Sequence, residues 1–243
     1  MITSNMRYSG LPQLAQVLAI YQDRGLKTFT VQAIKKLLAP NVRMGSICFF
    51  ERDLRASMPS LAPVEGIVLR EGSVADVSLL DCLKDAERQK NEALERFEAG
   101  HHWYLSLDKS TGQLASYRWA SLTSAFIPEI NRMILLNPGE AYLYDLYTLP
   151  QFRRRGIEGV SRQFIYNRLL EQYGASRLVV YIKPDNYASL RAGRNYLSPL
   201  SRVWYLQFKG GETRLFMRNN ARMPELQIVR SETESDRLIS RAS

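Results

Sequence analysis

The segment that most constrains the fold is residues 141–170, "AYLYDLYTLPQFRRRGIEGVSRQFIYNRLL", where a strand-like run is followed by a loop and a helix-like run. Pro150 ends the pairing of the first run, because proline has no backbone N–H to donate. Apolar residues at helical spacing then mark one face, namely Ile157, Val160, Phe164, Leu169 and Tyr173. The segment therefore predicts a strand, an arginine-rich loop and a helix over residues 157–173.

The loop between these two runs, residues 153–156, has the features of an anion-binding site. The first N–H groups of a helix have no intrahelical partner and, together with the positive end of the helix dipole, they attract an anion. Gly156 lets the backbone turn sharply and approach a ligand closely. Arg153, Arg154 and Arg155 add positive charge. A phosphate group is the ligand that this arrangement favours, and a solvated basic loop is the alternative.

The rest of the chain reads as alternating strands and helices. Ser73 is the expected cap of the first helix, with Asp76 three residues later. Residues 122–139, which contain Pro128 and Pro138, read as irregular. The predicted elements are strand 65–70, helices 73–83 and 87–100, hairpin 101–121, strand 141–148, helix 157–173, strand 177–182, helix 186–194 and hairpin 202–217. This order predicts an α/β domain.

Residues 1–62 predict an N-terminal extension of two short helices and a strand. The helices are expected at 12–24 and from residue 30 to Pro40, where apolar residues repeat at helical spacing. A lid, a homodimer surface and a membrane contact stay open as roles, but their mixed polar faces favour packing against the sheet. The main domain is expected at 63–218, followed by a charged, mobile tail at 219–243.

The chain of 243 residues carries a net charge of +9 that is spread unevenly. Residues 1–62 contribute +5, residues 63–140 contribute −4 and residues 141–243 contribute +8. The positive charge at both ends of the chain would suit a nucleotide, a nucleic acid or an anionic membrane surface as a partner. Two cysteines are too few for a disulfide framework, and no apolar stretch is long enough to span a bilayer. A cytoplasmic protein is expected.

Two motifs carry a resemblance to a known family. The segment "DLYTLPQFRRRGIEG" resembles the acyl-CoA-binding motif of the GNAT (GCN5-related N-acetyltransferase) superfamily, Arg/Gln-x-x-Gly-x-Gly/Ala. Arg153 and Gly156 match its first two positions, whereas Glu158 stands at the third, one residue before Gly159. The segment "DNYASLRAGRNY" resembles the family's next motif, with matches at Asn186, Ser189 and Leu190. Gly193 stands where the family often has a tyrosine that acts as general acid.

This resemblance covers residues 65–218 and implies a fold, a reaction and a cofactor site. The fold is a mixed, mostly antiparallel sheet flanked by helices, in which the central strand separates from its neighbour to admit a thioester. The reaction is transfer of an acyl group from acetyl-CoA, or a longer acyl-CoA, to a primary amine of a small molecule or amino sugar. The implied cofactor-binding residues are Leu146, Tyr147, Thr148, Arg153, Arg154, Arg155, Gly156, Ile157, Glu158, Gly159, Asn186 and Ser189.

Acyl transfer to an amine needs a base for the amine and a donor for the carbonyl oxygen. Asp145 is the candidate base, with Tyr144 and Tyr147 as polar site residues, and strand alternation places Asp145 and Tyr147 on one face. An ion pair between Asp145 and an arginine of the basic C-terminal half is the alternative. His101 and His102 open a strand and are expected at the surface or in a cap, with the acceptor pocket as the other option. No metal site is expected, because no cysteine or carboxylate lies at ligand spacing.

Two other functions stay open. A transferase of the same fold could take its acyl or aminoacyl group from a carrier protein or an aminoacyl-tRNA, which the altered glycine motif and the basic ends would suit. A protein of this fold that has lost its catalytic activity and serves as a binding or regulatory partner would explain why Glu158 and Gly193 depart from the family's motifs. Other nucleic-acid binding is not expected, because a buried strand accounts for the aromatic and basic run "SRVWYLQFKGG".

Overall fold

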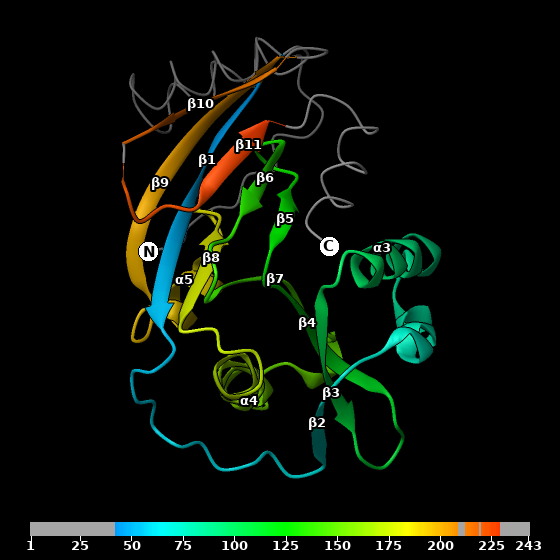
Figure 1. Cartoon of the computed structure of the whole chain (residues 1–243). Coiled ribbons are helices and arrows are strands. Elements are labelled where there is room, and N and C mark those ends of the chain that lie inside the picture. The colour runs from blue at the N-terminus through cyan, green and yellow to red at the C-terminus, as the bar shows by residue number, and fades with distance from the viewer. Residues whose placement is uncertain (1–41, 209–211, 219, 229–243) are drawn as a thin grey trace, which may run out of the picture. The chain divides into compact units, whose positions relative to one another are not determined.

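The structure is a computed structural model that describes residues 42–208, 212–218 and 220–228 (Figure 1). The described residues fall into two compact units, one with residues 42–46, 204–208 and 212–216 and the other with residues 47–203, 217–218 and 220–228. These boundaries differ from those predicted at residues 62 and 218. The two helices expected before residue 41 lie outside the described residues.

The larger unit is built on one twisted sheet with strand order β9-β1-β8-β7-β4-β3-β2. The ladders β1–β8, β4–β7, β3–β4 and β2–β3 are antiparallel, whereas β7–β8 is parallel. The mixed, mostly antiparallel sheet is thereby confirmed. The strands are β1 (Val42–Asp53), β2 (Ile67–Glu71), β3 (His102–Asp108), β4 (Leu114–Ser121), β7 (Glu140–Thr148), β8 (Arg177–Ile182) and β9 (Ser198–Phe208).

In the smaller unit, β1, β9 and β10 (Thr213–Met217) pair in the order β10-β9-β1. Gly45 of β1 is required there by a close approach, because a Cβ at this position would lie 2.5 Å from the hydroxyl of Tyr205. The β1 strand was predicted within an N-terminal extension. In the larger unit its residues Cys48 to Asp53 pair with β8, so this strand is part of the main sheet.

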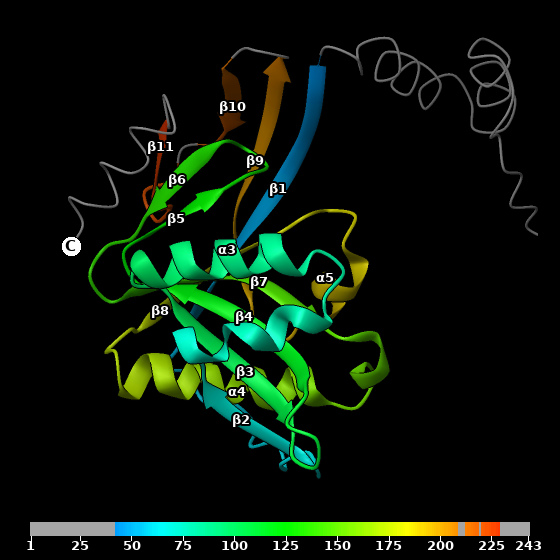
Figure 2. The same cartoon turned by 90° about the vertical axis from the view of Figure 1, so that its right-hand side faces the viewer.

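Helices cover both faces of the sheet in the larger unit, with α3 on one face and α4 on the other (Figures 1 and 2). Each predicted helix from residue 73 onward is present, although the first is a 3-10 helix. The helical elements are η1 (Val74–Cys82), α3 (Ala86–Glu98), η2 (Pro150–Phe152), α4 (Ile157–Glu171) and α5 (Tyr187–Gly193).

A second, three-stranded sheet of order β11-β6-β5 was not predicted. Its strands are β5 (Ser124–Ile127), β6 (Arg132–Leu135) and β11 (Glu225–Ile228). The expectation of irregular structure throughout 122–139 is wrong, because β5 and β6 lie there. The strand β11 lies within the tail 219–243, whose mobility stays a prediction. Four-residue strands are too short to show alternation, and β11 is ordered by pairing with a strand far away in the sequence.

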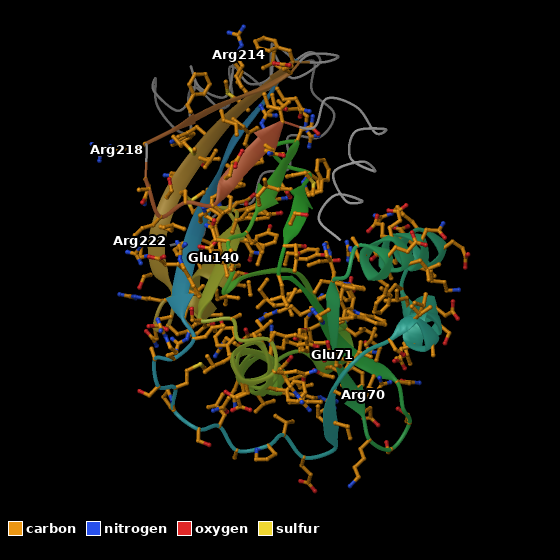
Figure 3. The ribbon with its side chains drawn as sticks, viewed as in Figure 1. Arg70, Glu71, Glu140, Arg214, Arg218 and Arg222 are labelled. Carbon is orange, nitrogen blue, oxygen red and sulfur yellow. The ribbon has the colours of Figure 1, made fainter. Side chains whose placement is uncertain are left out.

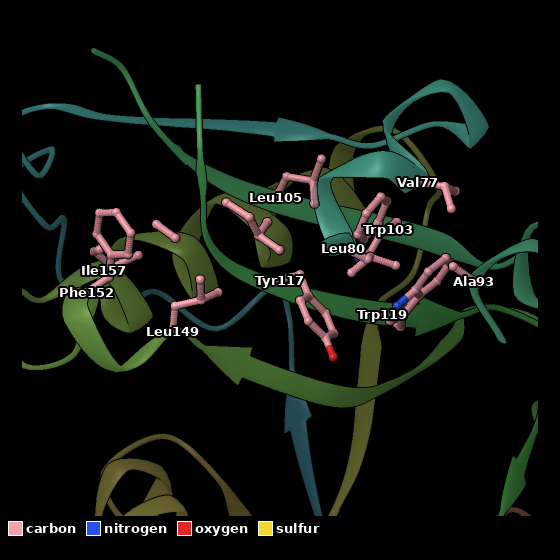
Figure 4. Packing of buried hydrophobic residues seen from close by; sticks show 12 residues of the cluster. Val77, Leu80, Ala93, Trp103, Leu105, Tyr117, Trp119, Leu149, Phe152 and Ile157 are labelled. Carbon is pink, nitrogen blue, oxygen red and sulfur yellow. The ribbon is translucent and has the colours of Figure 1, made fainter. Parts of the chain in front are cut away.

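Alternation along β3 and β4 distributes the large side chains between the two helix layers. Trp103 and Trp119 are buried on the α3 face, where their rings stack with centroids 5.4 Å apart (Figure 4). Tyr104 points to the opposite face and packs with α4. Leu149, Phe152 and Ile157 extend the first cluster to the start of α4, so the core itself fixes the loop before that helix.

Buried charges fix the closed end of the β7–β8 ladder. Glu51 of β1 and Glu140 of β7 are both buried, and Arg177 of β8 forms ion pairs with the two carboxylates. Arg222 adds a second ion pair to Glu51, and Figure 3 shows Arg222 and Glu140 together with the surrounding strands. Removing one partner of such a group leaves an uncompensated buried charge, so this end of the ladder is strongly held.

The carboxylate that helps to cap η1 also forms an ion pair. Arg70 of β2 (Figure 3) donates to both carboxylate oxygens of Asp76, at 2.6 and 2.8 Å. The backbone N–H of Ser73 donates to the same carboxylate at 2.9 Å, which confirms Ser73 as the cap position. The Arg70 guanidinium, helped by Ser73, lowers the pKa of Asp76 to about 2.

Replacing this carboxylate should destabilise the protein in a pH-dependent way. We expect Asp76→Asn to lower the free energy of unfolding by about 1–2 kcal/mol at pH 7, because a cap and a bidentate ion pair are lost. A carboxyl with a depressed pKa stabilises the fold above pH ~4 and loses this effect as the pH falls towards ~2. The difference from wild type should therefore shrink over that range in urea titrations.

The partner variant Arg70→Gln should show the same pH dependence, and the double variant should cost less than the sum of the two. A difference between wild type and Asp76→Asn that stays constant from pH 7 to pH 3 would contradict this account.

Candidate functional site

The two parallel central strands pair over only three residues. The ladder runs from Glu140 opposite Arg177 to Tyr142 opposite Val179, and no further β7–β8 pair follows within the described part of the chain. Residues of both strands beyond this point line one cavity of about 1110 Å³. Those residues are Leu143, Tyr144, Asp145 and Leu146 of β7 and Val180, Tyr181 and Ile182 of β8. The separation that the resemblance implies is therefore present.

A β-bulge lies on β7 where it borders this cavity. Tyr144 is opposite Trp119 and Tyr147 is opposite Tyr117, so two residues of β7 face one of β4. Asp145 within the bulge has a positive φ of 47°. Tyr144 and Tyr147 consequently both pack on the α3 face, and the predicted strict alternation is wrong here because of the extra residue.

Asp145 lies in the cavity lining and is held by an ion pair. Its carboxylate contacts the guanidinium of Arg96 on α3, which also lies over the rings of Trp119 and Tyr144 at 5.2 and 5.3 Å. Burial acts to lower the pKa of Arg96, but Asp145 and Tyr144 raise it above its ordinary value. An ion pair of Asp145 with an arginine was the alternative to a catalytic role, and this ion pair is present. Its arginine, however, lies on α3 and not in the C-terminal half of the chain. The role of Asp145 as a base stays a prediction.

Tyr144 shares the cavity with His101, which was expected at the surface or in a cap. Nε2 of His101 lies 2.9 Å from the carbonyl oxygen of Ser124, so this nitrogen carries the proton. Nδ1 then accepts a hydrogen bond from the Tyr144 hydroxyl, 2.5 Å away. Burial, with a smaller effect of Arg96, lowers the pKa of His101 to about 4. The imidazole is therefore neutral near pH 7 and fixes the Tyr144 hydroxyl in one orientation.

Tyr147 and His102 lie outside the cavity lining. The ring of Tyr147 packs against the ring of Tyr117, with centroids 6.0 Å apart. The guanidinium carbon of Arg153 lies 6.0 Å from the centroid of the same Tyr147 ring. His102 pairs with Glu71 at 2.9 Å and contacts the ring of Tyr173. Of the three predicted catalytic residues, the structure brings Tyr144 and Asp145 to the cavity.

The arginine loop leads into the uncapped start of α4. Gly156 is the N-cap residue with a φ of 77°, and no described side chain caps the helix. Arg154 also has a positive φ, 64°, which is strained for a residue with a side chain. Arg153 donates from Nε to the carbonyl of Thr148 at 3.0 Å, and Arg155 lies over the ring of Phe152. Residues 153–156 are exposed, so the three arginines lie at the surface where α4 begins.

Glu158, the departure from the glycine motif, is engaged by two arginines. Its carboxylate accepts hydrogen bonds from Arg162 at 2.6 Å and from Arg118 at 3.4 Å, and all three residues line the cavity. Gly159 has a packing requirement, because a Cβ there would meet Leu61 at 3.0 Å. The first turn of α4 thus extends from the exposed loop into the cavity.

The second motif is placed by the capping of α5. The side chain of Asn186 accepts a hydrogen bond from the backbone N–H of Ser189 at 3.1 Å, and both residues line the cavity. At Gly193, where the family often has a tyrosine, a Cβ would lie 2.8 Å from the end of the Leu197 side chain, so a larger residue there would require Leu197 to move. Tyr196 lines the cavity instead.

Among the cavity residues that sequence reasoning did not assign to the site are Arg96, Arg118, Arg162 and Tyr196, and local signals existed for two of them. Arg162 follows Glu158 by four residues, the spacing of an ion pair on a helix. Arg118 is a charged residue in the middle of the strand-like run "QLASYRWAS". Arg96 and Tyr196 have no such local signal, because tertiary packing alone brings them to the cavity.

Glu129 is a further charged residue of the cavity lining. Glu129 accepts hydrogen bonds from Lys183 at 2.7 Å and from Tyr181 at 2.6 Å, and these contacts hold its pKa below the ordinary value although burial acts to raise it. Within the described ranges no group of His, Cys, Asp or Glu could hold a metal ion. Among the same residues, no helix combines the length and apolar character that crossing a membrane requires.

Comparisons with known proteins were made by sequence and by structure. No protein-family model matches the sequence, and no curated protein is similar to it. A tandem GNAT protein from the clavulanic acid biosynthesis pathway is similar in structure, with a TM-score of 0.51 and 15% identity, over 73% of this chain and 58% of that one. A GCN5-related N-acetyltransferase from Sphaerobacter thermophilus gives a TM-score of 0.44 and 13% identity, over 74% and 56% of the two chains.

A third structure, a GCN5-related N-acetyltransferase from Kribbella flavida, gives a TM-score of 0.45 and 12% identity, over 72% of this chain and 63% of that one. The chain therefore spans less than two thirds of the length of these three proteins. The tandem GNAT protein carries the comparison, because its TM-score is above 0.5, and its low identity makes this a statement about the fold. The chain therefore has the fold of the GCN5-related N-acetyltransferases.

Proposed function

We propose that this chain is an acyl-CoA-dependent N-acyltransferase, in the simplest case an N-acetyltransferase, that acylates a primary amine of a small molecule or amino sugar. One observation carries the proposal: the cavity opened by the separation of β7 and β8 continues to the first turn of α4, behind an exposed loop of three arginines. This arrangement provides a slot for a thioester next to donors for a diphosphate.

The loop fits the phosphate groups of an acyl-CoA. Gly156 leaves space, because the nearest atom to a Cβ built there is a methyl carbon of Val64 at 3.8 Å. The carboxylate of Glu158 would repel a diphosphate, but its ion pairs with Arg162 and Arg118 hold it within the cavity lining. Arg153, Arg154 and Arg155, with the first N–H groups of α4, would hold the phosphates, and the edge of β7 beyond Tyr142 would bind the pantetheine amides.

An acyl-CoA would supply an activated carbonyl, and the chain would position the amine and handle protons. Tyr144 is the residue best placed for this, because His101 orients its hydroxyl at the bulge of β7. Asp145 supports the same region through Arg96. The exposed carboxylate of Glu95 and the carboxylate of Glu129 lie on the cavity wall and would attract a cationic amine.

The loop can be tested by calorimetric titration with acetyl-CoA at low and moderate salt. We expect wild type to bind in the micromolar range and Arg153→Ala/Arg155→Ala to bind about 100-fold more weakly, since two charge-assisted contacts to phosphate are removed. The double variant Arg55→Ala/Arg168→Ala, which removes two exposed arginines elsewhere, should bind like wild type. Absence of binding to wild type at either salt concentration would contradict the proposal and favour a carrier-protein or aminoacyl-tRNA donor.

The role of Tyr144 can be tested by release of free thiol from acetyl-CoA with a panel of primary amines. We expect Tyr144→Phe to reduce turnover by about 100- to 10,000-fold, the range for loss of a proton-transfer group, without changing the Kd for acetyl-CoA. Tyr173→Phe removes a hydroxyl that is bound to Glu71 outside the cavity, and it should retain turnover. Equal turnover in Tyr144→Phe and wild type would rule out this role for Tyr144.

A further inference from the structure

A cluster of charges on the α4 side of the cavity has no role in the proposed function. It consists of Arg118 from β4, Glu158 and Arg162 from α4, and Tyr196 after α5, and all four residues line the cavity. Arg118 and Arg162 are only 8% and 9% exposed. Guanidinium groups are costly to bury without anionic partners, so the positions of their counter-charges are informative.

Glu158 is the shared partner of the two arginines. Nη1 of Arg162 donates to both carboxylate oxygens, at 2.8 and 2.6 Å, and also to the Tyr196 hydroxyl at 2.5 Å. The Arg162 guanidinium stacks on the Tyr196 ring, 3.8 Å from its centroid. Arg118 makes one contact to Glu158, which is longer at 3.4 Å. Arg162 is therefore held firmly, whereas Arg118 is held by one weak contact.

The cluster has more positive charge than its carboxylate can balance. Two guanidinium groups share one carboxylate, and among the described residues neither has another ion pair. Nε of Arg162 is buried without a hydrogen-bond partner in the same part of the chain. A buried donor without a partner is unfavourable, so the cluster is built to accept one more anion.

We propose that Arg118 binds a carboxylate group of the substrate, an inference that rests on the proposed function. We favour a carboxylate over a phosphate because the two guanidinium groups already bind one planar carboxylate, that of Glu158. A planar guanidinium group can form two parallel hydrogen bonds to a carboxylate. The substrate carboxylate takes Arg118, and Glu158 stays on Arg162. Glu158 then competes with the substrate carboxylate for Arg118. This competition would give Glu158, the residue that departs from the glycine motif, a function in substrate selectivity.

The carboxylate could belong to the acyl group or to the amine, and two pairs of ligands separate these sources. Succinyl-CoA is compared with acetyl-CoA, and lysine is compared with 1,5-diaminopentane in the presence of CoA, by calorimetric titration. We expect the carboxylate-bearing member of one pair to bind about tenfold more tightly to wild type, the effect of one charge-assisted hydrogen-bonded contact. Arg118→Gln should remove this preference.

A second variant should increase the preference for the carboxylate-bearing ligand. Glu158→Gln removes the competing carboxylate and should raise the preference by about another tenfold, an outcome that misfolding cannot produce. Arg168→Gln and Glu171→Gln, exposed positions at the far end of α4, are the matched controls and should behave like wild type.

The outcomes distinguish this inference from the proposed function. A preference in the CoA pair assigns the carboxylate to the acyl group, and a preference in the amine pair assigns it to the acceptor. Binding of acetyl-CoA with no preference in either pair, or a preference that Arg118→Gln and Glu158→Gln leave unchanged, overturns the inference and leaves the function standing. A lysine preference lost in Arg118→Gln, without binding of either CoA ester, supports the carboxylate site and overturns the acyl-CoA function.

Discussion

The short parallel ladder between β7 and β8 is the constraint on which the rest of the site depends. Backbone hydrogen bonds normally continue along neighbouring strands, because an unpaired strand edge inside a protein is unfavourable. Here pairing ends after Tyr142 and Val179 although both strands continue. The buried ion pairs of Arg177 with Glu51 and Glu140 hold the paired end closed, and the other end opens into the cavity.

The bulge at Asp145 lies at this opening, and the strained residue Arg154 lies in the loop that follows β7. Both residues have positive φ values, which cost of order 1 kcal/mol or more in a residue with a side chain and persist only where surrounding contacts impose them. Arg96 holds the bulge from α3, and the packing of Leu149, Phe152 and Ile157 holds the loop. The core therefore stabilises an unusual backbone at the place where a ligand would need free N–H and C=O groups.

The sequence predicted the elements from residue 65 onward because their apolar spacing, caps and glycines are local signals. Ser73, Gly156 and the helix from Ile157 are where those signals placed them. The β5–β6 hairpin and β11 were missed because each strand has four residues and its pairing partner is what orders it. The extra residue of the bulge could not be predicted either, since it is defined by register with Trp119 and Tyr117.

The cavity itself was predicted only in part, for a similar reason. Tyr144, Asp145 and the Glu158 turn were identified, whereas Arg96, Arg118 and Tyr196 come from other elements that meet them only in the folded chain. Gly159 and Gly193 lie close to the side chains of Leu61 and Leu197, and these neighbours are likewise set by the fold. Glu158 is different, because its environment is ionic rather than steric.

The central claim is that the separated strands and the start of α4 form one site for an acyl-CoA. A crystal structure of the chain with CoA tests it most directly. The account predicts that the pantetheine arm lies between β7 and β8 beyond Tyr142, with the diphosphate at the N–H groups that follow Gly156. CoA bound elsewhere on the chain, with this opening left free, would contradict it.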